Sequence, residues 1–147
     1  MHLRNHIILS TITSVGFAYL SHSSSATVAC FLSGIFIDLD HLIDYYDAKK
    51  KITFSYHQLK EWCILNKEGR LFLFLHSYEL FLIFWVLIYY FNLGVNWVGL
   101  MTGMTVHLIA DQFSNPLKPL SYFLVYRLKL GFKKEKLLKQ DYLKQLV

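Results

Sequence analysis

Residues 26–45, with the sequence ATVACFLSGIFIDLDHLIDY, form an apolar run that ends in acidic residues and a histidine. The run has about the 20 predominantly apolar residues that a helix needs to cross a membrane. Three further stretches, residues 5–20, 71–91 and 95–113, are similarly apolar. Of the 147 residues, 54% are apolar, which is more than a soluble domain of this size readily hides from water. The sequence therefore predicts an all-α integral membrane bundle of four transmembrane helices.

The distribution of basic residues predicts which side of the membrane each connection faces. All fifteen Lys and Arg residues lie at Arg4, within residues 46–70 or within residues 118–144, whereas the connections 21–25 and 92–95 contain none. Because positively charged connections stay in the cytoplasm, both termini and residues 46–70 are expected there, in a multi-pass protein of the inner (plasma) membrane. The net charge of +5 fits contact with anionic membrane lipid, and the sequence gives no indication of a nucleic-acid partner.

Two parts are expected along the chain. Residues 1–116 would form the four-helix transmembrane domain, with an amphipathic cytoplasmic loop at 46–70, and residues 117–147 a basic interfacial or cytoplasmic tail. Within the tail, residues 120–132 are too short and too often interrupted by charge to span, which favours an interfacial amphipathic helix. A cleaved signal ending before Cys30 is an alternative for the first stretch, but the residues after Cys30 continue as an apolar run.

Ionisable residues inside the predicted spans indicate a site. Such residues are costly in hydrocarbon, so they normally pair, bind ions or line a polar cavity. In the predicted topology, the cytoplasmic side holds the starts of the first and third spans. It also holds the ends of the second and fourth spans. Because the ionisable residues lie at those ends, we expect all of them to converge at one depth: His6, Asp38, Asp40, His41, Asp44, His76, Glu79, His107 and Asp111.

The spacing of these residues suits metal ligation. Positions i and i+3 or i+4 share a helix face, and three pairs have this spacing: Asp38 with His41, His76 with Glu79, and His107 with Asp111. Imidazole and carboxylate without thiolate suit zinc first, and also manganese or iron, with one or two divalent ions in the cluster. Asp38 and Asp40 lie about 200° apart on an ideal helix. Both therefore face one ion only if the helix frays, or else one of them acts through another ligand.

Each of these residues also has an ordinary alternative role. A single His on an apolar helix face is often a hydrogen-bonded packing residue, and His107 with Asp111 could be a plain ion pair. A metal-free bundle held by ion pairs is disfavoured, because no Lys or Arg lies deep within the predicted spans. Three histidines fall outside the set and are expected to be exposed or interfacial: His2, His22 and His57.

Three motifs together resemble a known family. Gly34-Ile35-Phe36-Ile37-Asp38-Leu39-Asp40-His41, then Leu75-His76-Ser77, then Gly103 to His107 with Asp111, are similar to motifs of the YdjM-like (DUF457-type) family of membrane-bound metal-dependent hydrolases. The resemblance covers residues 6–111. The chain departs from the family pattern at Ile37, where Pro is common, and at Phe74 and Leu75, where Arg and Thr are common. The resemblance implies a metal site at His6, Asp38, Asp40, His41, His76, His107 and Asp111.

Metal-assisted hydrolysis is the expected chemistry. A bound ion would activate a water molecule, and Asp40 or Glu79 would accept its proton. The predicted site opens at the headgroups of the inner leaflet, where residues 49–51 and 133–139 would attract anionic lipid. We therefore expect a phosphoester or ester of a membrane lipid as substrate. The alternative is a non-enzymatic protein with a structural or ion-handling metal site, which would lack the open coordination position of a catalytic ion.

Overall fold

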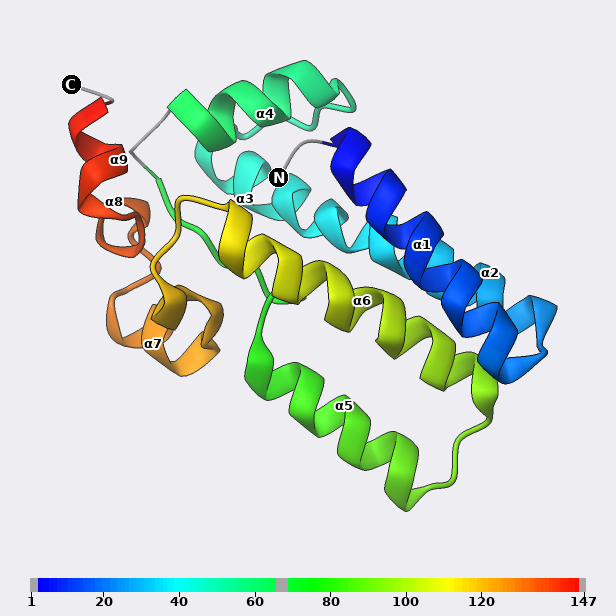
Figure 1. The fold of residues 1–147 in the computed structure, drawn as a ribbon. Coiled ribbons are helices and arrows are strands. Elements are labelled where there is room, and N and C mark those ends of the chain that lie inside the picture. Colours follow the sequence, from blue (N-terminus) through cyan, green and yellow to red (C-terminus); the bar gives the residue numbers. More distant parts are fainter. Residues whose placement is uncertain (1–2, 66–68, 146–147) are drawn as a thin grey trace. The chain divides into compact units, whose positions relative to one another are not determined.

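The computed structural model describes residues 3–65 and 69–145, and every element within them is a helix (Figure 1). The expectation of an all-α fold is therefore confirmed. The helices form two compact units, which are described separately. Unit 1 comprises residues 1–37 and 79–115, and unit 2 comprises residues 38–78 and 116–147.

Unit 1 is built on three helices that lie side by side, α1 (Leu3–Ser21), α2 (Ser24–Phe36) and α6 (Val95–Ser114) (Figure 1). The apolar stretches expected at 5–20 and 95–113 are thus helices. The side chain of Ser23 accepts a hydrogen bond from the Ala26 N–H and so caps the start of α2. A fourth helix, α5 (Tyr78–Tyr90), is linked to α6 by a hydrogen bond from Trp85 Nε1 to Thr105 Oγ1 (3.1 Å).

Helices α2 and α6 approach closely through small residues. A Cβ placed on Gly103 would lie 2.0 Å from the carbonyl oxygen of Cys30, and one placed on Gly99 would lie 2.3 Å from that of Ala26. Both glycines are buried and lie one turn apart, in the small-xxx-small arrangement that lets helix backbones pack tightly in membranes. The motif is visible in the sequence at residues 99–103 and was not among the predicted features.

The helices of unit 1 carry many large apolar side chains on their outer surfaces, while buried positions hold serines as well as a few large apolar side chains such as Met101 and Leu108. Ile12 is 65% exposed and Phe113 is 82% exposed, whereas Ser10 and Ser14 are buried. Many other large apolar side chains of these helices are exposed, among them Ile8, Val15, Tyr19, Leu20, Leu82, Ile83, Val86 and Tyr90. So much exposed apolar surface is unusual for a water-soluble bundle.

One helical run near the N-terminus, Ser24–Lys49, is long and apolar enough to cross a membrane. It comprises α2, a 3₁₀ turn η1 (Ile37–Leu39) and α3 (Asp40–Lys49). Among the described residues no other helix meets both criteria, and α5, which is strongly apolar, has 13 residues. Length and composition alone also fit a core helix of a soluble protein. By this measure the structure supports one span of the four expected.

The third apolar stretch is only partly helical, which corrects the expectation of a helix over 71–91. Helix α5 begins at Tyr78, and residues 71–77 have an irregular backbone. The N–H groups of Phe72 and Leu75 donate to Asp44 and Asp40 of α3, each at 2.7 Å. Leu73, between them, has a left-handed φ of 44°. Hydrogen bonds to side chains therefore replace those of a helix in this segment.

The tail of unit 2 forms several short helices, which corrects the expectation of one amphipathic helix over 120–132. Helix α7 (Leu124–Lys129) ends before Gly131 and Phe132, which both have positive φ angles. Backbone hydrogen bonds from Leu71 to Phe132 (2.9 Å) and from Lys134 to Gly69 (3.0 Å) join this tail to the segment before α5. The remaining elements of the unit are α4 (Tyr56–Leu65), η2 (Pro119–Tyr122), α7 (Leu124–Lys129), α8 (Lys134–Leu137) and α9 (Gln140–Gln145).

Candidate metal centre

In unit 1, two histidines and one aspartate form a buried group. His6 comes from α1, and His107 and Asp111 lie one turn apart on α6. His6 Nε2 lies 3.6 Å from Asp111 Oδ1, and His107 Nε2 lies 3.4 Å from Asp111 Oδ2. The two imidazole rings are stacked, with their centroids 4.0 Å apart. One possible ligand atom from each residue lies within 4.8 Å of the others, so the group could hold a metal ion.

The hydrogen bond of His107 fixes the role of each of its ring nitrogens. Nδ1 lies 2.7 Å from the carbonyl oxygen of Gly34. A carbonyl oxygen only accepts, so Nδ1 carries the hydrogen. In a neutral ring, Nε2 then presents a lone pair toward the Asp111 carboxylate. Two acceptors that face each other are stabilised by a cation between them, which can be a metal ion or a proton on the ring.

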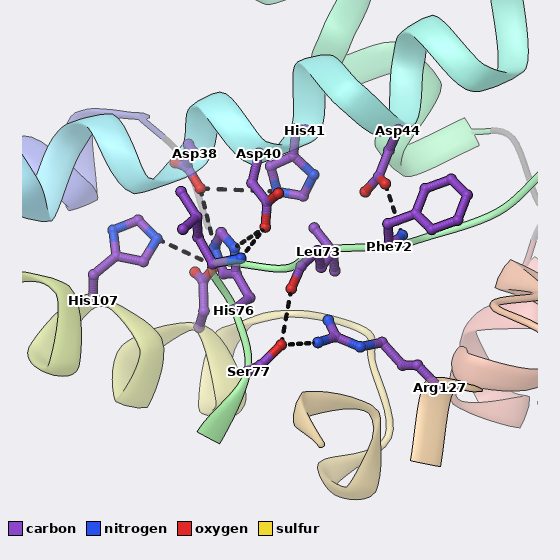
Figure 2. Close-up of polar contacts among 12 residues, drawn as sticks. Asp38, Asp40, His41, Asp44, Phe72, Leu73, His76, Ser77, His107 and Arg127 are labelled. Carbon is purple, nitrogen blue, oxygen red and sulfur yellow. Dashed lines mark hydrogen bonds and ion pairs between the residues drawn. The ribbon is translucent and has the colours of Figure 1, made fainter. Parts of the chain in front are cut away.

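In unit 2, Asp38, His41 and His76 form a second group that could hold a metal ion (Figure 2). Asp38 Oδ1 lies 3.5 Å from His76 Nε2 and 3.8 Å from His41 Nε2. His76 is buried, whereas the side chains of Asp38 and His41 are 30% and 23% exposed. The group thus repeats the composition of the first one, with two imidazoles and one carboxylate, but it is more accessible to solvent.

Asp40 lies on the opposite side of the His76 ring from Asp38, near Nδ1. Its Oδ2 accepts the hydrogen bond from the Leu75 N–H and lies 3.4 Å from His76 Nδ1 (Figure 2). Asp38 lies within the 3₁₀ turn η1, whereas Asp40 is the first residue of helix α3. Asp38 therefore faces one nitrogen of His76 and Asp40 the other. A carboxylate that holds the second nitrogen of a ligating imidazole is a common arrangement in metal proteins.

Three residues beside this group were not predicted as ligands or catalytic residues, although Asp44 was among the ionisable residues expected to converge. Asp44 Oδ1 accepts from the Phe72 N–H, Ser77 Oγ donates to the Leu73 carbonyl oxygen (3.3 Å), and Arg127 donates to Ser77 Oγ (Figure 2). Asp44, Ser77 and Arg127 are all buried. The position of Asp44 one turn after Asp40 was a usable signal, but the burial of Arg127 has no counterpart in the sequence pattern.

The other predicted residues lie outside both groups. Glu79 is in the first turn of α5 and is half-buried, and neither candidate metal group among the described residues includes it. His22 is exposed, and exposed His57 pairs with Glu61 (3.5 Å), in agreement with their expected ordinary roles. His2 lies outside the described residues.

The structure brings six of the seven expected metal ligands into two groups, one within each unit. Convergence of all seven residues on one centre stays a prediction. No family model, curated protein or solved structure matches the chain. The resemblance to the YdjM-like family therefore also stays a prediction.

Proposed function

We propose that the chain is a membrane-bound metal-dependent hydrolase, a divergent relative of the YdjM-like family, in which each group holds one divalent ion. The observation that carries the proposal is the pattern of acceptors. Asp111 and Asp38 are each faced by the Nε2 atoms of two imidazoles, at 3.4 to 3.8 Å. In each group the Nδ1 atom of one imidazole lies against another oxygen, the Gly34 carbonyl or Asp40. A metal ion would satisfy these lone pairs together.

The donor set guides the identity of the ion. Two imidazoles and one carboxylate form the protein part of catalytic zinc sites, and they also suit iron and manganese. Zinc remains the first choice because it accepts a tetrahedral site with three protein ligands and one water. The proposal thus expects a fourth position, open to water or substrate, at whichever ion is catalytic.

The exposed apolar surface of unit 1 supports the proposal of four membrane spans. Side chains such as Ile12 and Phe113 would be costly to leave in water but stable in lipid. The glycine contacts between α2 and α6 fit a bundle that is packed by close backbone approach. With the basic residues on one side, both termini would be cytoplasmic and the ionisable residues near the inner leaflet.

The two groups differ in exposure, which supports different roles for them. The unit 2 group is partly open at Asp38 and His41, whereas the three residues of the unit 1 group are all buried. We therefore propose that the unit 2 group carries out hydrolysis and that the unit 1 group holds α1 and α6 together. A bound ion would lower the pKa of its water toward neutrality. The predicted general bases are Asp40, in unit 2, and Glu79, in unit 1, and the variant below distinguishes them. A phosphoester or ester of a membrane lipid would be the substrate.

The alternative is a non-enzymatic protein in which both ions are structural or are handled as cargo. Because all three residues of the unit 1 group are buried, a structural role is favoured for an ion in that group. The two functions differ in one outcome, because only the hydrolase turns over a substrate.

The test is hydrolysis of lipid phosphoesters and lipid esters by the purified full chain, with Glu79→Gln as the informative variant. If Glu79 is the general base, this variant keeps its metal and slows hydrolysis by about 10²- to 10⁴-fold. Glu61→Gln is the matched control, because Glu61 lies on α4 and pairs only with exposed His57 among the contacts described. Metal-loaded protein that hydrolyses nothing across the substrate panel rejects the enzyme reading. Loss of metal in Glu79→Gln would make Glu79 a ligand and leave Asp40 as the base.

A further inference from the structure

A buried arginine of the tail contacts the segment that carries His76. Arg127 on α7 is fully buried, although charge patterning placed this region at the membrane surface. Its Nη2 donates to Ser77 Oγ, and Ser77 in turn donates to the carbonyl oxygen of Leu73 (Figure 2). Ser77 directly follows His76, so the guanidinium acts on the chain next to a candidate ligand.

The segment that carries His76 is held by two different elements. Figure 2 shows α3 on one side of it, with Asp40 and Asp44 accepting its backbone N–H groups, and Arg127 on the other. The backbone of the tail reinforces this contact, because the Phe132 N–H donates to the Arg127 carbonyl oxygen (2.9 Å). Arg127 also interacts electrostatically with Asp44. These contacts compensate the cost of burying a charged guanidinium.

The irregular backbone of this segment makes such support necessary. Residues 71–77 form no helix or strand, and the His76 N–H makes a single turn bond to the Leu73 carbonyl oxygen (2.9 Å), so side-chain contacts help to determine where His76 points. Asp40 fixes the backbone at Leu75, one residue before His76. Ser77 fixes it one residue after, and Arg127 holds Ser77.

We propose that Arg127 is a positioning residue for His76. By holding Ser77, it keeps the imidazole in the orientation in which Nδ1 faces Asp40 and Nε2 faces Asp38. The inference rests on the proposed metal site of unit 2, and it gives the C-terminal tail a part in building that site. Arg127 acts through Ser77 and His76, so removing it would alter the geometry of the site rather than its list of ligands.

The experiment measures two properties of the purified full chain in detergent micelles. The first is the tautomer of His76 in metal-free protein, read from ¹⁵N chemical shifts of the imidazole. The second is the zinc affinity of the unit 2 group. Arg127→Met should populate a second tautomer of His76 and weaken zinc binding by about tenfold, as loss of a supporting residue around a ligand does. Ser77→Ala should reproduce both effects, and Arg127→Lys, which keeps a charged donor, should recover part of them.

The matched control is Lys129→Met, which removes an exposed basic side chain from the same short helix. It should change neither property. An unaltered His76 tautomer in both Arg127→Met and Ser77→Ala would overturn the inference, even if thermal stability falls. If the unmutated protein binds no zinc, the proposed function fails, but the tautomer comparison in metal-free protein still decides the positioning role.

Discussion

One carboxylate oxygen of Asp40 makes two contacts, one with the backbone just before His76 and one with the imidazole ring of His76. Oδ2 accepts the Leu75 N–H and faces His76 Nδ1, so it orders the backbone and the ring together. The sequence predicted that Asp38 and Asp40 could not both face one ion on a regular helix. It could not predict which of them faces the ion, because that depends on the irregular segment 71–77, which donates to Asp40 across 35 residues of chain.

The role of Asp40 predicts a specific effect of Asp40→Asn. The amide oxygen can still accept the Leu75 N–H, so the fold should persist. The carboxylate that holds the hydrogen on His76 Nδ1 would be lost, and metal affinity at the unit 2 group should fall by about 10- to 100-fold. Isothermal titration with zinc measures this change. Asp47→Asn, on the same helix and paired with Lys50, should leave the affinity unaltered. Equal effects of the two variants would refute the assigned role.

At the scale of elements, the composition and length of apolar runs located α1 and α6 within a few residues. The second run, 26–45, is divided in the structure between α2 and α3 by the turn η1. The same signals failed for the segment before α5, because residues 71–75 are as apolar as the helix that follows them. The irregular backbone there results from capture of two N–H groups by Asp40 and Asp44, which is a tertiary effect. The prediction of one helix over 120–132 was wrong for a related reason. Gly131 and Phe132 both have positive φ angles, and α7 ends before them.

The close packing of α2 on α6 predicts opposite effects for two identical substitutions. Gly16→Ala places its Cβ where nothing lies within 4 Å, so it should stabilise α1 by up to about 1 kcal/mol through helix propensity. Gly103→Ala places its Cβ 2.0 Å from the Cys30 carbonyl oxygen and should destabilise the protein by about 1–3 kcal/mol. Thermal unfolding in micelles compares the two. A neutral Gly103→Ala would show that α2 and α6 do not pack in this way.

At the scale of the whole molecule, the charge asymmetry predicts that both termini are cytoplasmic. Neither short connection between the expected spans contains Lys or Arg, whereas the N-terminus, the central segment and the tail do. Fusions at Val147 to a reporter active only in the cytoplasm should therefore be active, and fusions in residues 92–95 should not. The reverse pattern would invert the topology and move the candidate metal groups to the other face of the membrane.

Elemental analysis of the purified protein tests whether the two sets of imidazole and carboxylate groups bind divalent ions. About two ions per chain are expected after mild detergent extraction, one for each group. His107→Ala and His76→Ala should each retain about one ion, because each variant disrupts a different group. The variant with both substitutions should retain none, with its helix content preserved. Unmutated protein that carries no stoichiometric metal would contradict the account, and His107 and His76 would then belong to buried ion pairs.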